Sequence, residues 1–132
     1  MGFEKDFDGW NEVKKKVQDQ EDRIFFHERE VWWCSFGINV GHEQDGKGKD
    51  FRRPAIVFKK FNHQVFWAIP LTTRKKVGKY YFPITMKDGV FRNAVLSQLR
   101  LIDSKRIFQK VGYISEDQHK RLIQEIIKIC ER

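Results

Sequence analysis

The sequence predicts an α+β domain that is mainly β, with a small barrel of short strands and one helix at each end. Short aromatic and β-branched segments follow one another closely through the middle of the chain, separated by turn residues. Apolar residues recur at helical spacing only near the two ends. Strands this short and this closely spaced favour a small barrel over a doubly wound sheet.

The length of 132 residues allows one domain with a single compact core. An apolar content of 40%, with 14% aromatic residues, is typical of a globular chain. Every apolar run is shorter than the roughly 20 residues of a membrane span. The first residues do not have the basic and then apolar pattern of a signal peptide. We therefore expect a cytoplasmic protein with no membrane segment.

The cysteines and histidines do not form a metal-binding pattern. Cys34 and Cys130 are far apart in the sequence, and the four histidines are scattered. A zinc site needs closely spaced ligands, and a small secreted domain held by disulfides would carry more cysteines. We expect two free thiols, no metal site and no cofactor.

Positive charge is concentrated in the middle of the chain. The net charge is +8, but residues 44–110 contain 16 Lys and Arg against four acidic residues. The rest of the chain has 10 basic and 14 acidic residues. A surface without a partner usually mixes its charges, so this local bias predicts a site for a polyanion. Charge alone does not separate RNA from DNA or from an acidic protein.

A helix is expected at each end of the chain. Over residues 8–20, Asp8 can cap the N-terminus, and Trp10, Val13 and Val17 fall on one face. Near the C-terminus, Ser115 followed three residues later by Gln118 predicts a capping box. An apolar stripe for core packing then includes Leu122, Ile123, Ile126, Ile127 and Cys130.

Five or six strands are expected between these helices. The clearest segments are residues 30–40, 54–58, 65–69, 80–86 and 90–99. Pro54 is expected to open the second segment, where a missing N–H group is tolerated. Asp88-Gly89 predicts a hairpin turn between the last two.

Polar residues gather at the ends of the predicted strands, in five short motifs. They are Glu-Val-Trp-Trp at 30–33, Gly-His-Glu-Gln at 41–44, Arg-Arg-Pro-Ala at 52–55, Ile-Pro-Leu-Thr-Thr at 69–73 and Ser-Gln-Leu-Arg-Leu-Ile-Asp at 97–103. In order and spacing this set is similar to the PemK/MazF toxins, over about residues 29–130. Each motif is weak alone, but five in the right order are specific.

A phosphate-binding loop is the competing interpretation of residues 41–48. The segment nearly fits the pattern G-x-x-x-x-G-K-[ST], but Gly48 replaces the hydroxyl residue that would bind magnesium. The residues that follow lead into a predicted strand, whereas the pattern requires a helix. The sequence therefore disfavours a nucleotide-binding loop.

The resemblance implies an SH3-like β-barrel domain over residues 29–132, with a C-terminal helix, preceded by an N-terminal helical extension over residues 1–28. It also implies a homodimer, a cognate antitoxin as partner, and a metal-independent endoribonuclease that cleaves single-stranded RNA. By the same resemblance, Arg53 and Thr72 are the catalytic residues.

The chemistry of RNA cleavage suits these residue types. The RNA supplies its own nucleophile, the 2′-OH, so the enzyme must move protons and stabilise the phosphate. Arg53 can donate paired hydrogen bonds to phosphate oxygens, and Thr72 can add a neutral donor. His42 is the candidate acid or base because of its intrinsic pKa, although family members differ at its position. Each residue also has an alternative interpretation. Arg53 would then be a surface arginine in an ion pair, Thr72 a strand-end hydroxyl and His42 an ordinary loop histidine.

Ten further residues are expected to bind RNA. Glu43 and Gln44 would hold the loop or contact bases, Phe51 would stack on a base or pack within the loop, and Gln98 would support the site or the dimer. The complete set is Glu43, Gln44, Lys47, Lys49, Phe51, Arg52, Thr73, Arg74, Lys75 and Gln98.

The chain also departs from the family pattern. Some members have an acidic residue before the Gln of the last motif and an Arg two positions before that acidic residue. In this chain the two positions are Ser97 and Val95. A mechanism that depends on Asp is therefore not carried over. Two other functions stay open. One is a non-catalytic relative that binds RNA or an antitoxin on the same fold. The other is a gyrase poison, whose Trp-Gly-Ile terminus is absent here.

Overall fold

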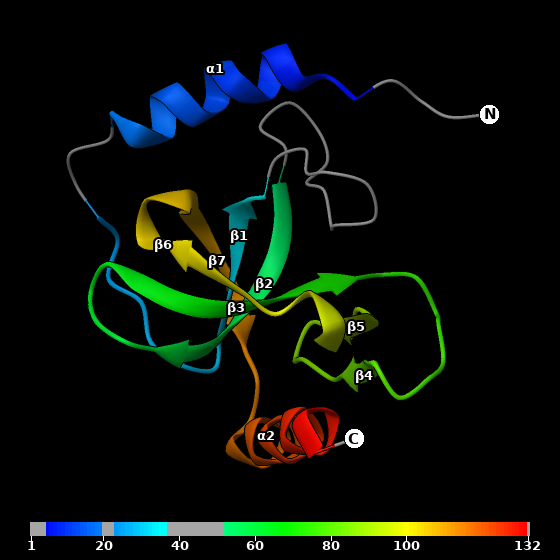
Figure 1. Ribbon diagram of the computed structural model, residues 1–132. Coiled ribbons are helices and arrows are strands. Elements are labelled where there is room, and N and C mark those ends of the chain that lie inside the picture. Colours follow the sequence, from blue (N-terminus) through cyan, green and yellow to red (C-terminus); the bar gives the residue numbers. More distant parts are fainter. Residues whose placement is uncertain (1–4, 20–22, 37–51, 132) are drawn as a thin grey trace.

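The computed structural model describes residues 5–19, 23–36 and 52–131 (Figure 1). Two α-helices and seven strands make up most of this part of the chain. They are α1 (Phe7–Gln18), β1 (Glu30–Ser35), β2 (Arg52–Lys60), β3 (Val65–Thr72), β4 (Tyr81–Ile84), β5 (Arg92–Val95), β6 (Arg100–Asp103), β7 (Ile107–Tyr113) and α2 (Glu116–Glu131). Two short 3₁₀ turns, η1 (Leu96–Gln98) and η2 (Ser104–Arg106), flank β6.

The strands form one antiparallel sheet in the order β4-β5-β3-β2-β1-β7, with β6 paired to β3. Strand β3 changes partner along its length, because residues 65–68 pair with β6 and residues 71–72 pair with β5. The sheet is not closed. The predicted class, a mainly β small barrel with a helix at each end, is confirmed, although the barrel is open. Its strands number seven, against the five or six expected.

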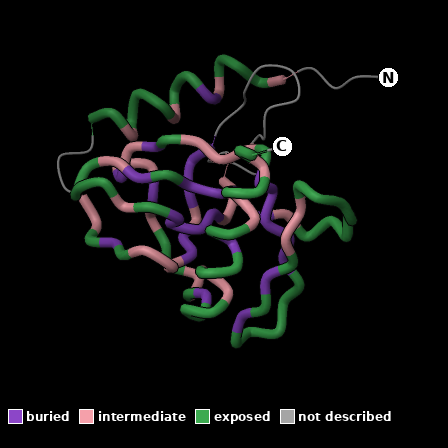
Figure 2. The backbone as a smooth tube through the Cα atoms, turned by 60° about the horizontal axis from the view of Figure 1, so that its bottom comes forward, coloured by how far each residue is buried: buried purple, intermediate pink, exposed green. Residues whose placement is uncertain are grey.

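Neighbouring residues of the central strands contribute to two separate cores. In β2, Ile56 and Phe58 belong to the first core, whereas Ala55 and Val57 belong to the second. This alternation follows from the pleat, which points successive side chains to opposite faces of a sheet. The first core is completed by β4, β5 and α2, and the second by Phe26, β6 and the start of β7. Figure 2 shows that buried residues run through the middle of the molecule, while α1 is mostly exposed.

Helix α1 is capped by Asp6, and the expected cap at Asp8 is therefore wrong. The Gly9 N–H donates to Asp6 Oδ1 at 2.9 Å. A Cβ atom at Gly9 would lie 2.3 Å from Asp6 Oδ2, so a residue without a side chain suits this close approach. Asp8 lies in the first turn, where a carboxylate is stabilised by the helix dipole.

The strand that Pro54 was expected to open begins two residues earlier. Pro54 is the third residue of β2 and pairs with Trp33 of β1. The ladder between β2 and β3 begins only at Ala55. The chain thus continues as a strand through Arg52 and Arg53.

The expected hairpin between β4 and β5 is present, with a longer connection than Asp88-Gly89 alone. The strands end at Ile84 and resume at Arg92. Gly89 has a φ of 72°, a conformation that glycine adopts without strain. The strand predicted for residues 90–99 ends at Val95, and Gln98 falls in η1.

The start of α2 confirms half of the predicted capping box. Ser115 Oγ accepts from the Gln118 N–H at 3.1 Å. The Gln118 carboxamide, however, bonds to the backbone of Thr85, accepting from its N–H at 2.8 Å and donating to its C=O at 2.9 Å. This pair of bonds attaches the first turn of α2 to the end of β4.

The burial of α2 predicts unequal effects for two neighbouring substitutions. Leu122 is 0% exposed in the first core, whereas Ile123 is 38% exposed. Leu122→Ala should lower the free energy of unfolding by about 2–5 kcal/mol, because it leaves a cavity. Ile123→Ala should lower it by less than about 1 kcal/mol. Urea unfolding of both variants measures the difference, and equal losses would contradict this packing of α2.

Candidate functional site

A surface pocket of about 510 Å³ lies where β2 begins and β3 ends. We refer to it as the β2–β3 pocket. Its lining includes three guanidinium groups and two threonine hydroxyls on an apolar base. The lining residues are Trp33, Arg52, Arg53, Pro54, Leu71, Thr72, Thr73, Val90 and Arg92. The pocket thus combines residues from separate segments of the chain that the sheet brings side by side.

A backbone contact fixes Arg53 next to Thr72. The Nη1 group of Arg53 donates to the carbonyl oxygen of Leu71 at 3.1 Å. Leu71 directly precedes Thr72, the last residue of β3. This bond holds the guanidinium of Arg53 at the end of β3, and a guanidinium has five N–H donors in all.

The Thr72 hydroxyl is also oriented by the backbone. Thr72 Oγ1 accepts from the Arg74 N–H at 3.2 Å. A hydroxyl that accepts one hydrogen bond still has its own hydrogen to donate. Arg53 and Thr72 can therefore present a charged donor and a neutral donor in one pocket.

A buried asparagine holds the turn that follows Thr72. Asn93 pairs with Thr72 across β3 and β5, and its side chain is fully buried. Its Nδ2 group donates to the carbonyl oxygens of Lys76 at 2.8 Å and Arg74 at 3.4 Å. The exposed side chains of Arg74 and Lys75 are therefore carried on a turn whose backbone is tied to the sheet.

Arg92 is a pocket residue that the sequence analysis missed. It forms a bidentate ion pair with Asp88, with Nη2 to Oδ2 at 2.7 Å and Nη1 to Oδ1 at 2.9 Å. Hydrogen bonds from Arg92 and then from the Val90 N–H lower the pKa of Asp88 to about 2. Asp88 thus offsets the charge of Arg92. The sequence signal for Arg92 was an arginine within a predicted strand of mostly apolar residues.

Arg52 lies against an aromatic ring at the edge of the pocket. Its guanidinium carbon is 4.2 Å from the centre of the Phe108 ring, within the range of a cation–π interaction. Arg52 pairs with Ser35 across β1 and β2. Strand β7, which contains Phe108, lies on the other side of β1.

The structure brings four of the predicted site residues together. Arg52, Arg53, Thr72 and Thr73 line the β2–β3 pocket. Arg74 and Lys75 follow on the adjacent turn, and Gln98 lies half-buried in η1 and does not line the pocket. Six predicted residues lie outside the described part of the chain, namely His42, Glu43, Gln44, Lys47, Lys49 and Phe51.

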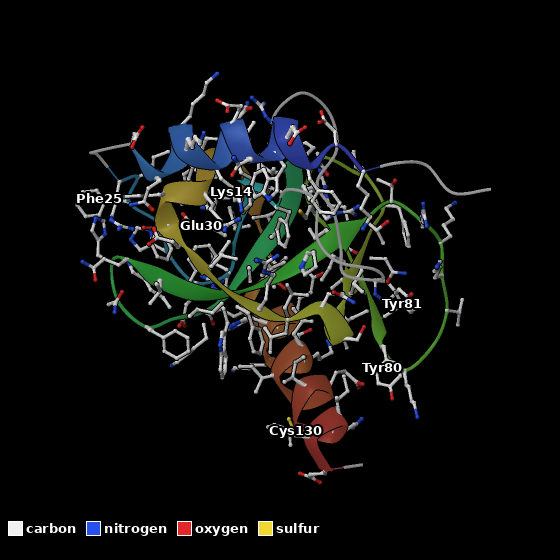
Figure 3. The ribbon with its side chains drawn as sticks, turned by 45° about the horizontal axis from the view of Figure 1, so that its top comes forward. Lys14, Phe25, Glu30, Tyr80, Tyr81 and Cys130 are labelled. Atoms are coloured by element: carbon white, nitrogen blue, oxygen red, sulfur yellow. The ribbon has the colours of Figure 1, made fainter. Side chains whose placement is uncertain are left out.

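Within the described residues, no three His, Cys, Asp or Glu side chains are close enough to hold a metal ion. The same part of the chain has no helix long and apolar enough to cross a membrane. Cys34 is buried, which raises the pKa of its thiol, and Cys130 is exposed; both are free. Figure 3 shows Cys130 on α2, and Tyr80 and Tyr81 near β4.

The described residues form an open antiparallel barrel with a basic pocket at its strand ends. The chain belongs to the PemK-like, MazF-like toxins of type II toxin–antitoxin systems, whose family model matches residues 27–130. The match includes every described residue of the β2–β3 pocket. No curated protein matches the sequence.

Solved structures share the fold at low sequence identity. MazF from Deinococcus radiodurans is 20% identical, with a TM-score of 0.65, over 83% of this chain and 99% of that chain. An endoribonuclease from a mycobacterial species, in complex with its cognate antitoxin, is 9% identical, with a TM-score of 0.61, over 81% and 96%. The MazE–MazF complex from Deinococcus radiodurans is 15% identical, with a TM-score of 0.59, over 81% and 96%.

The Asp88–Arg92 pair predicts a pH dependence at the pocket. The folded-state pKa of Asp88 is about 2, below the roughly 3.9 of an unfolded aspartate. The stabilisation is therefore fully present above about pH 4 and is lost as the pH falls toward 2. In a carboxyl-detected NMR titration, Asp88 should titrate near 2 and should shift upward in Arg92→Met. A wild-type midpoint at the ordinary aspartate value would contradict the ion pair.

Proposed function

We propose that this chain is a sequence-specific, metal-independent endoribonuclease toxin that cleaves single-stranded RNA in the cytoplasm. The observation that carries the proposal is the convergence of Arg53 and Thr72 in the β2–β3 pocket, with the backbone fixing both side chains. Arg53 belongs to the Arg-Pro-Ala motif and Thr72 to the Pro-x-Thr motif of the family, and the pocket lies within the matched residues.

The proposed reaction is an internal transesterification of the RNA. The 2′ oxygen forms a bond to the adjacent phosphorus, and the bond from phosphorus to the 5′ oxygen breaks. A base takes the proton from the 2′-OH, and an acid gives a proton to the departing 5′ oxygen. The products are a 2′,3′-cyclic phosphate and a 5′-OH end. His42 is our candidate for proton transfer, because of the intrinsic chemistry of the histidine side chain.

In this scheme Arg53 and Thr72 stabilise the charge that develops on the phosphate. The guanidinium of Arg53 donates to the non-bridging oxygens, on which negative charge increases in the transition state. Thr72 donates its hydroxyl hydrogen to the same phosphate. Donors that are already positioned are the most effective, because they need not reorganise during the reaction.

The remaining polar residues around the pocket are proposed to bind RNA. Arg52 and Thr73 line the pocket, and the turn held by Asn93 carries Arg74 and Lys75. The family resemblance adds Gln98, together with Glu43, Gln44, Lys47, Lys49 and Phe51 of the loop between β1 and β2. From the family resemblance we further propose a homodimer. We also propose a cognate antitoxin as partner, since two of the structures that share this fold are complexes with antitoxins.

Cleavage of a long unstructured RNA in EDTA tests the proposed activity. The wild type should give sequence-specific cuts that end in 2′,3′-cyclic phosphate. Arg53→Ala should lower kcat by about 10²–10³-fold, the usual effect of removing one transition-state donor. Thr72→Val, which keeps the shape of the side chain, should also lower kcat. The control is Arg121→Ala, because Arg121 is an exposed arginine on α2 whose ion-pair partner within the described residues is Asp117 of its own helix.

Three results would contradict this assignment. Cleavage that requires added Mg²⁺ would exclude the metal-independent reaction. Full activity in Arg53→Ala or Thr72→Val would remove that residue from the chemistry. RNA binding without any cleavage by the wild type would favour a non-catalytic binding protein on the same fold.

The proposed homodimer is tested by sedimentation. At micromolar concentration the purified chain should sediment with twice its mass of 15.9 kDa. A species with the mass of one chain over the whole range would contradict the dimer and would leave the β2–β3 pocket of one protomer as the complete site.

A further inference from the structure

A second pocket, of about 430 Å³, lies between α1 and η2. We refer to it as the α1–η2 pocket. Lys14 and Lys15 reach it from α1, and Lys105 and Arg106 reach it from η2. Trp10, Val17, Gln18, Asp19 and Asp103 complete the lining. Helix α1 lies outside the residues that the family model matches, so this pocket depends on an element added to the family fold.

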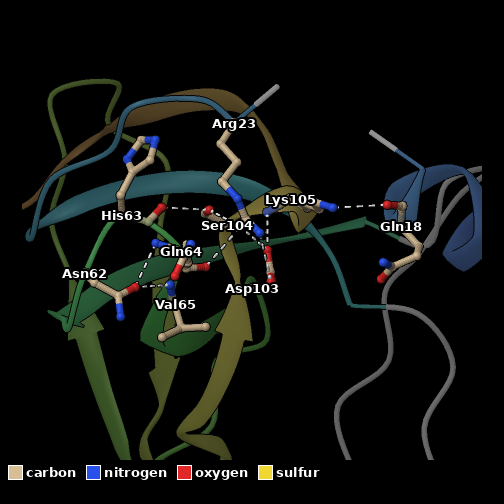
Figure 4. Close-up of polar contacts among 9 residues, drawn as sticks. All are labelled: Gln18, Arg23, Asn62, His63, Gln64, Val65, Asp103, Ser104 and Lys105. Atoms are coloured by element: carbon tan, nitrogen blue, oxygen red, sulfur yellow. Dashed lines mark hydrogen bonds and ion pairs between the residues drawn. The ribbon is translucent and has the colours of Figure 1, made fainter. Parts of the chain in front are cut away.

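The two sides of this pocket are attached to one another by polar contacts. Lys105 Nζ donates to the carbonyl oxygen of Gln18 at 3.1 Å, at the end of α1. Arg23, which follows α1, pairs with the carboxylate of Asp103 and donates to Ser104 Oγ at 2.9 Å (Figure 4). The Ser104 hydroxyl in turn donates to the His63 carbonyl oxygen at 3.0 Å. These bonds make the pocket a built feature of the fold.

One aromatic ring contacts a cation from each side of the pocket. Trp10 is only 5% exposed. The Arg106 guanidinium carbon lies 5.5 Å from its ring centre, and Lys14 Nζ lies 5.9 Å from it. The indole therefore holds both cations near one another by cation–π contacts. A buried ring offers little apolar area to an incoming partner, so the pocket presents mainly charge.

The positive charge of the α1–η2 pocket is incompletely neutralised within the described part of the chain. No ion pair there includes Lys14, Lys105 or Arg106. The lining also contains two carboxylates, Asp19 and Asp103, and Asp103 pairs with Arg23. Burial and the nearby charge of Arg100 lower the pKa of Arg106, whereas the carboxylate of Asp103 raises it. An anion placed here would relieve the repulsion between these cations.

The backbone of one residue links this pocket to the β2–β3 pocket. Arg106 Nη1 donates to the carbonyl oxygen of Ser35 at 3.1 Å. Ser35 is the cross-strand partner of Arg52, which lines the β2–β3 pocket. Arg106 of the α1–η2 pocket and Arg52 of the β2–β3 pocket thus both lie next to Ser35, so the two basic pockets are close to one another. A single RNA strand carries charge along its whole backbone and suits two neighbouring basic pockets.

We propose that the α1–η2 pocket binds the phosphate backbone of the same RNA strand whose scissile phosphate lies in the β2–β3 pocket. The inference rests on the proposed ribonuclease function. It assigns α1 a role in RNA affinity: a substrate long enough to reach both pockets binds more tightly than one confined to the cut site. The charged lining favours a nucleic-acid backbone over a protein partner, for which we would expect more exposed apolar area.

Charge reversal on α1 tests the inference, with a matched control on α2. The test variant is Lys14→Glu with Lys15→Glu, and the control is Lys120→Glu with Lys128→Glu. Lys15 and Lys128 are 63% and 61% exposed, and each pairs with a glutamate three residues earlier in its helix. Figure 1 places α1 and α2 at opposite ends of the molecule. Thermal unfolding checks that all variants remain folded.

Two RNAs that contain the same cut site provide the readout. One has about 6 nucleotides and the other about 25, a choice guided by site sizes of about 4–16 nucleotides in small barrels. Binding is measured by anisotropy with versions that carry a 2′-deoxy residue at the cut, and cleavage is measured with the unmodified RNAs. For the long RNA, the test variant should raise Kd and KM about tenfold or more. Loss of two phosphate contacts should flatten the salt dependence of log Kd by about 1.4.

The short RNA separates this site from the catalytic pocket. The inference predicts that the test variant binds and cleaves the short RNA as the wild type does, with kcat unchanged on both RNAs. Wild-type affinity of the test variant for the long RNA would overturn the inference, and so would an equal loss with the short RNA or with the control variant. If only the binding of an antitoxin is weakened, the pocket is a protein-docking site and the inference is wrong.

Failure of the ribonuclease proposal would give a different result. A wild-type protein that cuts neither RNA would overturn the proposed function. Because the binding measurement uses uncleavable RNA, it remains decisive in that case. A selective loss of long-RNA binding in the test variant would still support a phosphate site at α1, and no difference would overturn it.

Discussion

The arrangement of the other strands depends on how strand β3 pairs with its neighbours. It forms hydrogen-bonded ladders with β2, β6 and β5, and the last two share its opposite edge at different points along its length. A strand has only two edges, so β6 must end its ladder before β5 can begin. On the other edge of β3, the antiparallel ladder with β2 places Thr72, at the end of β3, beside the first residues of β2.

The two cores on opposite faces of one sheet explain why a polar site forms at this end. Strands β1, β2 and β3 contribute apolar side chains to both faces through most of their length. Neither core extends to Arg52 and Arg53 or to Thr72. Polar groups at such strand ends escape the penalty of burial and are still held by a rigid ladder. The pocket therefore combines accessibility with fixed geometry.

The sequence was most informative where a pattern extended over many residues. The two helices, strands β1 to β5 and the turn around Gly89 followed from periodicity and turn chemistry, whereas β6 and β7 lie outside the five segments named as strands. The family motifs also brought Arg53 and Thr72 together before their positions were known. Features that depend on a single side chain, such as a helix cap, were less predictable. Asp6 and Asp8 are equally good caps by residue type, and the backbone geometry decides between them.

Contacts between residues far apart in the sequence could not be predicted either, because they also depend on single side chains. Asn93 reaches back to a turn about 17 residues earlier in the chain. The α1–η2 pocket joins residues about 90 positions apart. Neither spacing has a local signature in the sequence. The chemical roles of the candidate residues stay predictions until cleavage is measured.

The bond between Arg53 and the Leu71 carbonyl determines when the Arg53 side chain loses its rotamer entropy. A freely moving arginine side chain has about 2 kcal/mol of rotamer entropy to lose when it becomes fixed. Here part of that loss accompanies folding, since the guanidinium is already held by the end of β3. Less of it remains to be lost when a ligand arrives, so the affinity of the pocket is reduced less by ordering its own side chain. The stability of the sheet thereby contributes to the preorganisation of the site.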